Sequence, residues 1–96
     1  MRNRNDEKLG EVLKEMLKFY RLDEKLDEHK LIHSWEKAVG PMIARHTTGI
    51  YISNKKLVVT IDSAVVRNEL LYARSKILND LNAMVGSQVA TELVLK

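Results

Sequence analysis

Few residues of this 96-residue chain have the spacing of a catalytic or metal-binding site. His29 and His33 lie one helical turn apart and Glu36 follows three residues later, so their side chains could hold a divalent metal from one side of a helix. Surface histidines on a charged helix have the same spacing. We favour this second interpretation because three loosely spaced ligands recur by chance, and we predict no metal and no cofactor.

The sequence also lacks the usual signatures of enzymes. It contains no cysteine, which excludes disulfides, thiolate metal sites and cysteine nucleophiles. None of its four glycines belongs to a phosphate-binding loop or to a Gly-x-Ser-x-Gly nucleophile elbow. We therefore expect a protein that is not an enzyme.

Basic side chains could bind phosphate. Sixteen Lys and Arg against thirteen Asp and Glu give a net charge of +3, which permits binding to a polyanion without requiring it. Lys55 and Lys56 have no acid after them until Asp62, and Arg45 precedes the same segment. For any single lysine, a solvated surface position is the alternative interpretation. Only the three together indicate a nucleic-acid contact.

Two aromatic residues could stack on bases. Trp35 has apolar neighbours at helical spacing, among them Val39, so we expect it in the core. Tyr51 alternates with Ile50 and Ile52, so burial of the two isoleucines turns Tyr51 outward. Tyr51 is therefore the candidate for stacking, although an exposed tyrosine is also a common strand former.

Two further candidates come from the ends of predicted elements. Residues 1–5 are polar and form a predicted flexible arm, in which Arg2 and Arg4 could reach phosphates. His46 could hydrogen-bond the local turn or contact phosphate. We favour the turn, because polar groups in a loop near a core need partners.

The first half of the chain has helical periodicity. We predict an amphipathic helix over 6–21, a second over 23–39 with Asp27 as the cap of its packed part, and a short one over 41–45 after Gly40. The apolar face of the first helix consists of Leu9, Val12, Leu13, Met16, Leu17 and Tyr20. In a chain of this length, we expect every element to pack on one core.

The period changes to two after residue 49. We predict strands over 50–53 and 56–62 joined by a tight turn at Asn54, then one helix over 62–86, and a last strand within 88–96. Asp62 or Ser63 would cap that helix, and Gly86 would end it. The predicted core includes Trp35, Val39, Gly40, Leu57, Val59, Ile61, Leu70, Ile77 and Leu81.

These elements predict a two-layer α+β domain over 6–96, in the order α-α-(short α)-β-β-α-β. A strand after a crossover helix returns parallel to its neighbour, so the three-stranded sheet should be mixed and packed on helices. No run approaches the roughly 18 apolar residues of a membrane span, and we expect a cytoplasmic protein without membrane partners.

Several motifs resemble the DciA family of bacterial proteins. They are the stretches WEKAVGP (35–41), ARHT (44–47), KLVVTIDS (56–63), Glu69-Leu70 and ILNDLN (77–82). They occur in order over about two-thirds of the chain. The chain looks like a short form of the family, without the polar C-terminal extension or the zinc ribbon of other members.

The resemblance implies a KH-like domain that binds DNA or RNA without sequence specificity and a role in bacterial DNA replication, with the replicative helicase as a candidate partner. The Gly-x-x-Gly loop with which KH domains clamp a nucleic-acid backbone is absent from the sequence. The alternative function is an adaptor that docks a partner protein through the first amphipathic helix.

Overall fold

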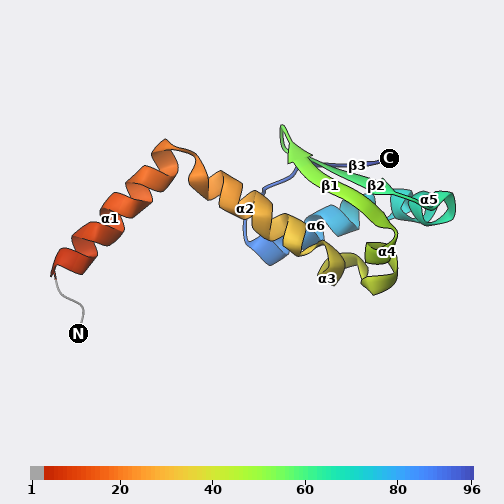
Figure 1. Ribbon diagram of the computed structural model, residues 1–96, viewed down its shortest axis with the longest axis horizontal. Helices are drawn as coiled ribbons and strands as arrows, with labels where there is room; N and C mark the ends of the chain where they lie inside the picture. Colours follow the sequence, from red (N-terminus) through yellow and green to blue (C-terminus); the bar gives the residue numbers. More distant parts are fainter. Residues whose placement is uncertain (1–3) are drawn as a thin grey trace.

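The computed structural model describes residues 4–96, which form helices and a mixed sheet (Figure 1). The elements are, in chain order, α1 (Arg4–Phe19), α2 (Leu22–His33), α3 (Trp35–Val39), α4 (Pro41–Arg45), β1 (Thr47–Ser53), β2 (Lys56–Ile61), α5 (Ala64–Tyr72), α6 (Arg74–Val85) and β3 (Glu92–Leu95). The predicted two-layer α+β class is confirmed. Arg2 lies outside the described residues, and Arg4 begins α1.

The sheet has the order β1-β2-β3, so the strand predicted as central does occupy the middle. β1 and β2 are antiparallel, and β3 returns parallel to β2 after α5 and α6. Asn54 and Lys55 both have positive φ, at 51° and 62°, as a two-residue turn of the primed type requires. The hairpin prediction is confirmed.

One face of the sheet carries the core. Leu57, Val59 and Ile61 alternate along β2 and are almost completely buried, against helix residues that include Leu31, Trp35, Leu70, Ile77 and Leu81. Val39 is partly buried at the edge of this core. Gly40 adopts φ 90° between α3 and α4, a conformation that favours glycine, and Pro41 follows at the first helical position.

The second predicted helix is interrupted. α2 ends at His33, and Ser34 separates it from α3. The Ser34 hydroxyl donates to the carbonyl of Lys30 at 2.8 Å, a side-chain bond that competes with helix continuation and commonly bends helices. The predicted Asp27 cap is wrong, because α2 begins at Leu22 after Arg21, whose φ is 57°.

The long helix predicted over 62–86 is also two helices. Ser63 caps α5 by accepting from the Val66 amide, and α5 ends at Tyr72; Ala73, with φ −106° and ψ 9°, then breaks the helix before α6. The break separates two directions of packing: α5 contacts β2 and β3, whereas α6 contacts β3, α2 and α3. Gly86 ends α6 with φ 89°, as predicted.

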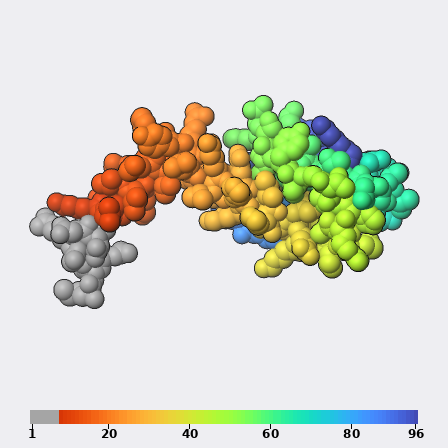
Figure 2. Space-filling view, in the orientation of Figure 1, coloured from red at the N-terminus to blue at the C-terminus, as the bar shows by residue number. Residues whose placement is uncertain are grey.

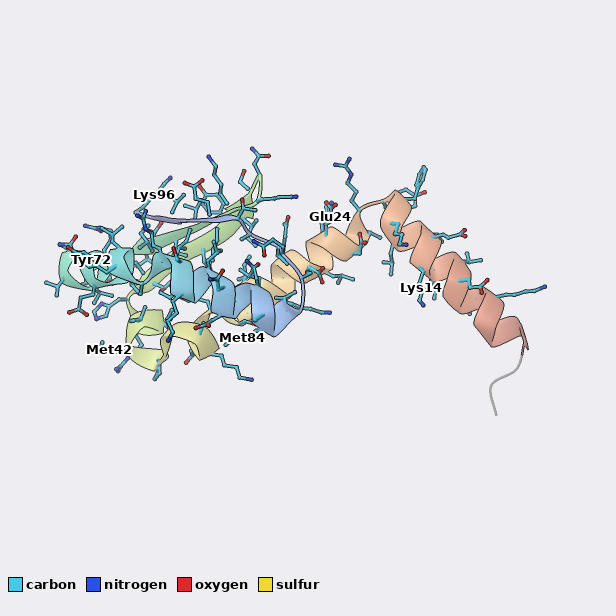
Figure 3. The ribbon with its side chains drawn as sticks, turned by 180° about the vertical axis from the view of Figure 1, so that it is seen from behind. Lys14, Glu24, Met42, Tyr72, Met84 and Lys96 are labelled. Carbon is cyan, nitrogen blue, oxygen red and sulfur yellow. The ribbon has the colours of Figure 1, made fainter. Side chains whose placement is uncertain are left out.

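α1 does not pack on the common core, which corrects the expectation for this element. It projects away from the sheet and gives the molecule a long dimension of 57 Å against 27 and 21 Å (Figures 1 and 2). The only described element with which α1 makes several contacts is α2. Met84 has the helical spacing of Ile77 and Leu81, but it is 45% exposed near the end of α6 (Figure 3).

We expect Val59→Asp to unfold the domain. The side chain is fully buried on β2, and an unpaired carboxylate there costs several kcal/mol, comparable with the whole stability of a small domain. Thermal unfolding followed by circular dichroism measures the loss. Val65→Asp on the exposed side of α5 is the matched control and should melt like the wild type. Native melting of Val59→Asp would show that the register of β2 is incorrect.

Candidate nucleic-acid interface

The second face of the sheet carries the aromatic candidate. Strand alternation places Tyr51, Val58 and Val94 in one row across β1, β2 and β3, on the side opposite Leu57 and Val59. None of the described helices supplies residues to this row. Tyr51 is 49% exposed, while Ile50 and Ile52 pack against the core. Tyr51 therefore points outward, as the alternation predicts.

Val58 is only 7% exposed although it lies on this uncovered face. Its register partners are Tyr51 on one side and Val94 on the other, so side chains from both edge strands shield it. The result is a small apolar platform with an aromatic ring at one side. This burial has no signal in the sequence, because Val58 alternates with the core residues.

Two lysines lie on the same face, one in each neighbouring row. Lys56 pairs with Ser53 and Glu92 in the row toward the hairpin tip. Lys96 continues β3 on the other side of Val94: its amide donates to the Val59 carbonyl at 2.9 Å (Figure 3). A lysine thus lies on either side of the aromatic row, and Glu92 shares the row of Lys56.

Each hairpin lysine has acidic neighbours in the tertiary structure. Lys56 Nζ lies 3.8 Å from Glu92 Oε2, in an ion pair whose side chains are both more than half exposed. Such a pair contributes about 0–1 kcal/mol and is screened by salt. Lys55 borders a hollow of about 140 Å³ that also contains Glu24, Asp27 and Glu28 of α2. The absence of acids between Lys56 and Asp62 in the sequence therefore does not mean that these lysines lack acidic neighbours in space.

Arg45 is not brought together with the hairpin lysines. It ends α4 just before β1, where Thr47 pairs with Ile61, whereas Ser53 pairs with Lys56 at the other end of the hairpin. Seven residues of strand separate the two ends by about 20 Å at 3.3 Å per residue. Arg4, at the start of α1, lies at the far end of the molecule from the sheet (Figure 1).

Arg67 and Arg74, which share a stripe by sequence spacing, both donate to backbone carbonyls. Arg67 Nη1 donates to the Ile61 carbonyl at 3.1 Å, and Arg74 Nε donates to the Leu71 carbonyl at 3.2 Å. Arg67 therefore ties the end of β2 to α5. Its replacement would change the fold as well as the surface charge.

The base of the hairpin is held by polar contacts around His46. The Asp62 amide donates to the His46 carbonyl at 2.9 Å, and His46 Nδ1 shares a 2.7 Å hydrogen bond with Asp62 Oδ1. These contacts give His46 the local structural role that we favoured. Of the two predicted helix caps, Ser63 is therefore the one that caps α5, whereas Asp62 binds His46.

Trp35 anchors the helices to β1. Its ring is 4% exposed, and Nε1 donates to Thr47 Oγ1 at 2.9 Å; Thr47 Oγ1 in turn donates to the Ile43 carbonyl at 3.0 Å. One threonine hydroxyl thus links α3, α4 and the first residue of β1. The indole is occupied in the core and is not available to stack on a base.

Asn82 is a structural residue that the chemistry of the sequence did not single out. It is 6% exposed on α6, its Nδ2 donates to the Ala90 carbonyl at 2.8 Å, and its Oδ1 accepts from the amides of Val89 and Ala90. A side-chain amide that offers both a donor and acceptors satisfies the loop before β3. The sequence did offer one indication of this buried role: Asn82 directly follows Leu81, on the side of the helix that carries the apolar residues.

The described part of the chain contains neither a candidate metal-ligand group nor a candidate membrane-spanning helix. No three His, Cys, Asp or Glu residues are grouped there to hold a metal ion. His29 and His33 stack with ring centroids 5.9 Å apart on α2, while Glu36 belongs to α3. None of the helices over residues 4–96 is both long and apolar enough to cross a bilayer.

The fold and the sheet face define a small two-layer α+β module in which one sheet face is open and carries a tyrosine. The family model described as Dna[CI] antecedent, DciA, matches residues 8–95. The chain belongs to the DciA family. The matched residues include Trp35, Asn82 and all three strands of the sheet.

Two curated relatives match most of this chain. A UPF0232 protein of Corynebacterium glutamicum (strain R) is 32% identical over 90 residues, which cover 94% of this chain and 51% of the relative. A UPF0232 protein in the recF-gyrB intergenic region of Mycolicibacterium smegmatis is 30% identical over 94% of this chain and 46% of its own length. The chain thus spans about half the length of the curated relatives it matches.

We expect Asn82→Ala to destabilise the domain by about 2–4 kcal/mol, because it leaves two amides and one carbonyl of the loop before β3 without partners in a buried site. Urea unfolding measures the difference. Asn79→Ala, at an exposed position of the same helix, should change stability by less than about 0.5 kcal/mol. Equal effects of the two substitutions would contradict the role assigned to Asn82.

Proposed function

We propose that this chain is a non-enzymatic protein that binds single-stranded nucleic acid without sequence specificity and acts with the replicative helicase in bacterial DNA replication. Membership of the DciA family supports the replication role. The observation that carries the binding site is the half-exposed Tyr51 on a sheet face that the described helices leave open.

The chemistry of this face favours unpaired bases. A base can stack on the Tyr51 ring and extend over the apolar side chains of Val58 and Val94, whereas bases inside a duplex are already stacked on each other. In this proposal, Lys56 and Lys96 meet the phosphates on either side of the stacked base, which their positions on the same sheet face support. Stacking tolerates any base, and phosphate contacts carry no sequence information, so the binding should be non-specific.

The other candidate residues have secondary roles in this proposal. Lys55 borders the acidic start of α2, which reduces the local potential, and Arg45 lies about 20 Å away at the other end of the hairpin. Arg45 could contact a phosphate only if the bound oligonucleotide is long enough to extend along the whole of β1. Arg2 and Arg4 are distant from the sheet in sequence, and this proposal assigns them no contact at the sheet face.

We expect Tyr51→Leu to weaken binding of a labelled oligonucleotide by about 5- to 150-fold, since the stacking of one base on an aromatic ring is worth about 1–3 kcal/mol. Leucine still covers Val58, so the fold should persist. Tyr51→Phe keeps the ring and should bind nearly as the wild type does. Fluorescence anisotropy with single-stranded DNA and RNA measures the affinities.

Tyr72→Leu is the matched control, because Tyr72 is 95% exposed on α5 at the far end of the helix layer (Figure 3). It should leave binding unchanged. If Tyr72→Leu weakens binding and Tyr51→Leu does not, the sheet face is the wrong surface. Absence of binding by the wild-type chain at low salt would reject the nucleic-acid function itself.

A double substitution, Lys56→Gln with Lys96→Gln, tests the phosphate contacts. Removal of one phosphate contact should reduce the slope of log affinity against log salt by about 0.7 for a single strand, so the double variant should show a slope smaller by about 1.4. Lys37→Gln with Lys76→Gln removes the same charge from exposed positions on α3 and α6, on the helix side of the sheet. An unchanged slope for the first pair would remove these lysines from the interface.

A second candidate function is docking of a protein through α1. The exposed apolar side of this helix favours it, because a contiguous apolar patch of several hundred Å² is unusual on a monomer and typically marks a protein interface. Such docking should depend weakly on salt, in contrast to phosphate binding.

A further inference from the structure

α1 has an apolar face that the rest of the described chain leaves largely exposed. Five of its large apolar side chains, and Tyr20 directly after it, are between 48% and 79% exposed, while Leu17 is partly buried; Leu22 and Leu26 of α2 are also exposed, at 41% and 51%. The face consists of Leu9, Val12, Leu13, Met16, Phe19 and Tyr20. Figure 2 shows α1 standing clear of the body of the molecule.

From this face we infer that α1 is a self-association helix, which pairs antiparallel with α1 of a second copy of this chain. The inference rests on the second candidate function and identifies the protein that docks there. It does not depend on nucleic-acid binding, which uses the opposite end of the molecule.

Charge favours a second copy as the occupant. Residues 4–11 carry three acids and two bases, whereas residues 14–21 carry one acid and three bases. The helix is therefore slightly negative in its first half and positive in its second. Antiparallel pairing aligns each half with its opposite in the other copy, and it also opposes the two helix dipoles.

The spacing of the apolar residues agrees with this pairing. Leu9, Val12, Met16 and Phe19 follow alternating three- and four-residue steps, so an antiparallel pair sets Leu9 against Phe19 and Val12 against Met16 of the other copy. An open hollow of about 310 Å³, lined by Val12, Met16, Phe19 and Tyr20 with Glu15 at its side, can receive apolar side chains of the second copy.

Helix stability provides a further argument. α1 has 16 residues, near the length at which an isolated helix is marginal in water, and it contains Gly10. Among the described elements it makes several contacts only with α2, so little tertiary packing supports it. Burial of its apolar face in a symmetric pair supplies that support. The wide face also suits contact with both α1 and the start of α2 of the second copy.

Sedimentation equilibrium of the full chain without nucleic acid tests the inference. The apparent mass should rise from 11.1 kDa toward twice that value as concentration increases. Met16→Glu places a carboxylate in the pair twice, by symmetry, and should weaken association at least about 100-fold. Lys18→Gln, which changes the net charge by the same amount on the opposite side of α1, should associate normally.

Each opposite outcome overturns the inference: a wild-type chain that stays at 11.1 kDa, a Met16→Glu chain that still associates, or a Lys18→Gln chain that no longer associates. A wild-type monomer that nevertheless captures purified replicative helicase through α1 would assign the face to that partner. Because these measurements use no oligonucleotide, their failure leaves the sheet-face proposal intact, and the Tyr51 variants test that proposal separately.

The orientation has its own test, because the chain contains no cysteine. Chains carrying Leu9→Cys and chains carrying Phe19→Cys are mixed and oxidised. Antiparallel pairing should yield mainly the mixed disulfide. A parallel pair would yield mainly the two homodimers, which would overturn the proposed orientation.

Discussion

Burial of Leu57, Val59 and Ile61 on one face of β2 is the interaction on which the rest of the structure depends. The strand lies in the middle of the sheet, so its inner side chains contact elements from both halves of the chain. The described helices pack on this inner face and leave the other face, with Tyr51, open.

Polar contacts then fix how the helices and loops meet this core. Trp35 and Thr47 tie α3 and α4 to β1, His46 and Asp62 close the base of the hairpin, and Asn82 holds the loop before β3. Each joins segments between which apolar packing alone would allow sliding. Two of the three lie at least partly within the core, where an unmatched polar group would be costly and a matched one selects a single arrangement.

The distribution of charge limits how the modest positive charge can act. Lys55 and Lys56 stand at a hairpin tip, but α2 and β3 bring Glu24, Asp27, Glu28 and Glu92 to the same end. The tip is also fixed in place, because the Thr91 amide donates to the Lys55 carbonyl at 2.8 Å. Electrostatics alone would therefore be a weak basis for binding, and this is why the proposed site centres on an aromatic ring with charges at its sides.

The sequence by itself determined the fold class, the central position of β2, its inward residues, the hairpin turn at Asn54 and the outward direction of Tyr51. These follow from local rules: side chains alternate along a strand, and the helix ends and turns carry residues suited to them. The motifs from Trp35 to Asn82 also indicated the family before any contact was known.

Only the tertiary structure decided where the helices break, which acids surround the lysines, and that α1 lies outside the common core. The break at Ala73 lets α5 and α6 pack in two different directions, and one continuous helical periodicity does not predict such a change. The acids near Lys55 belong to α2, which is distant in sequence. The apolar face of α1 has the same pattern as a core helix, and periodicity records that a face is apolar without recording what buries it. That distinction depends on how much core the remaining chain can supply, which is a property of the assembled structure.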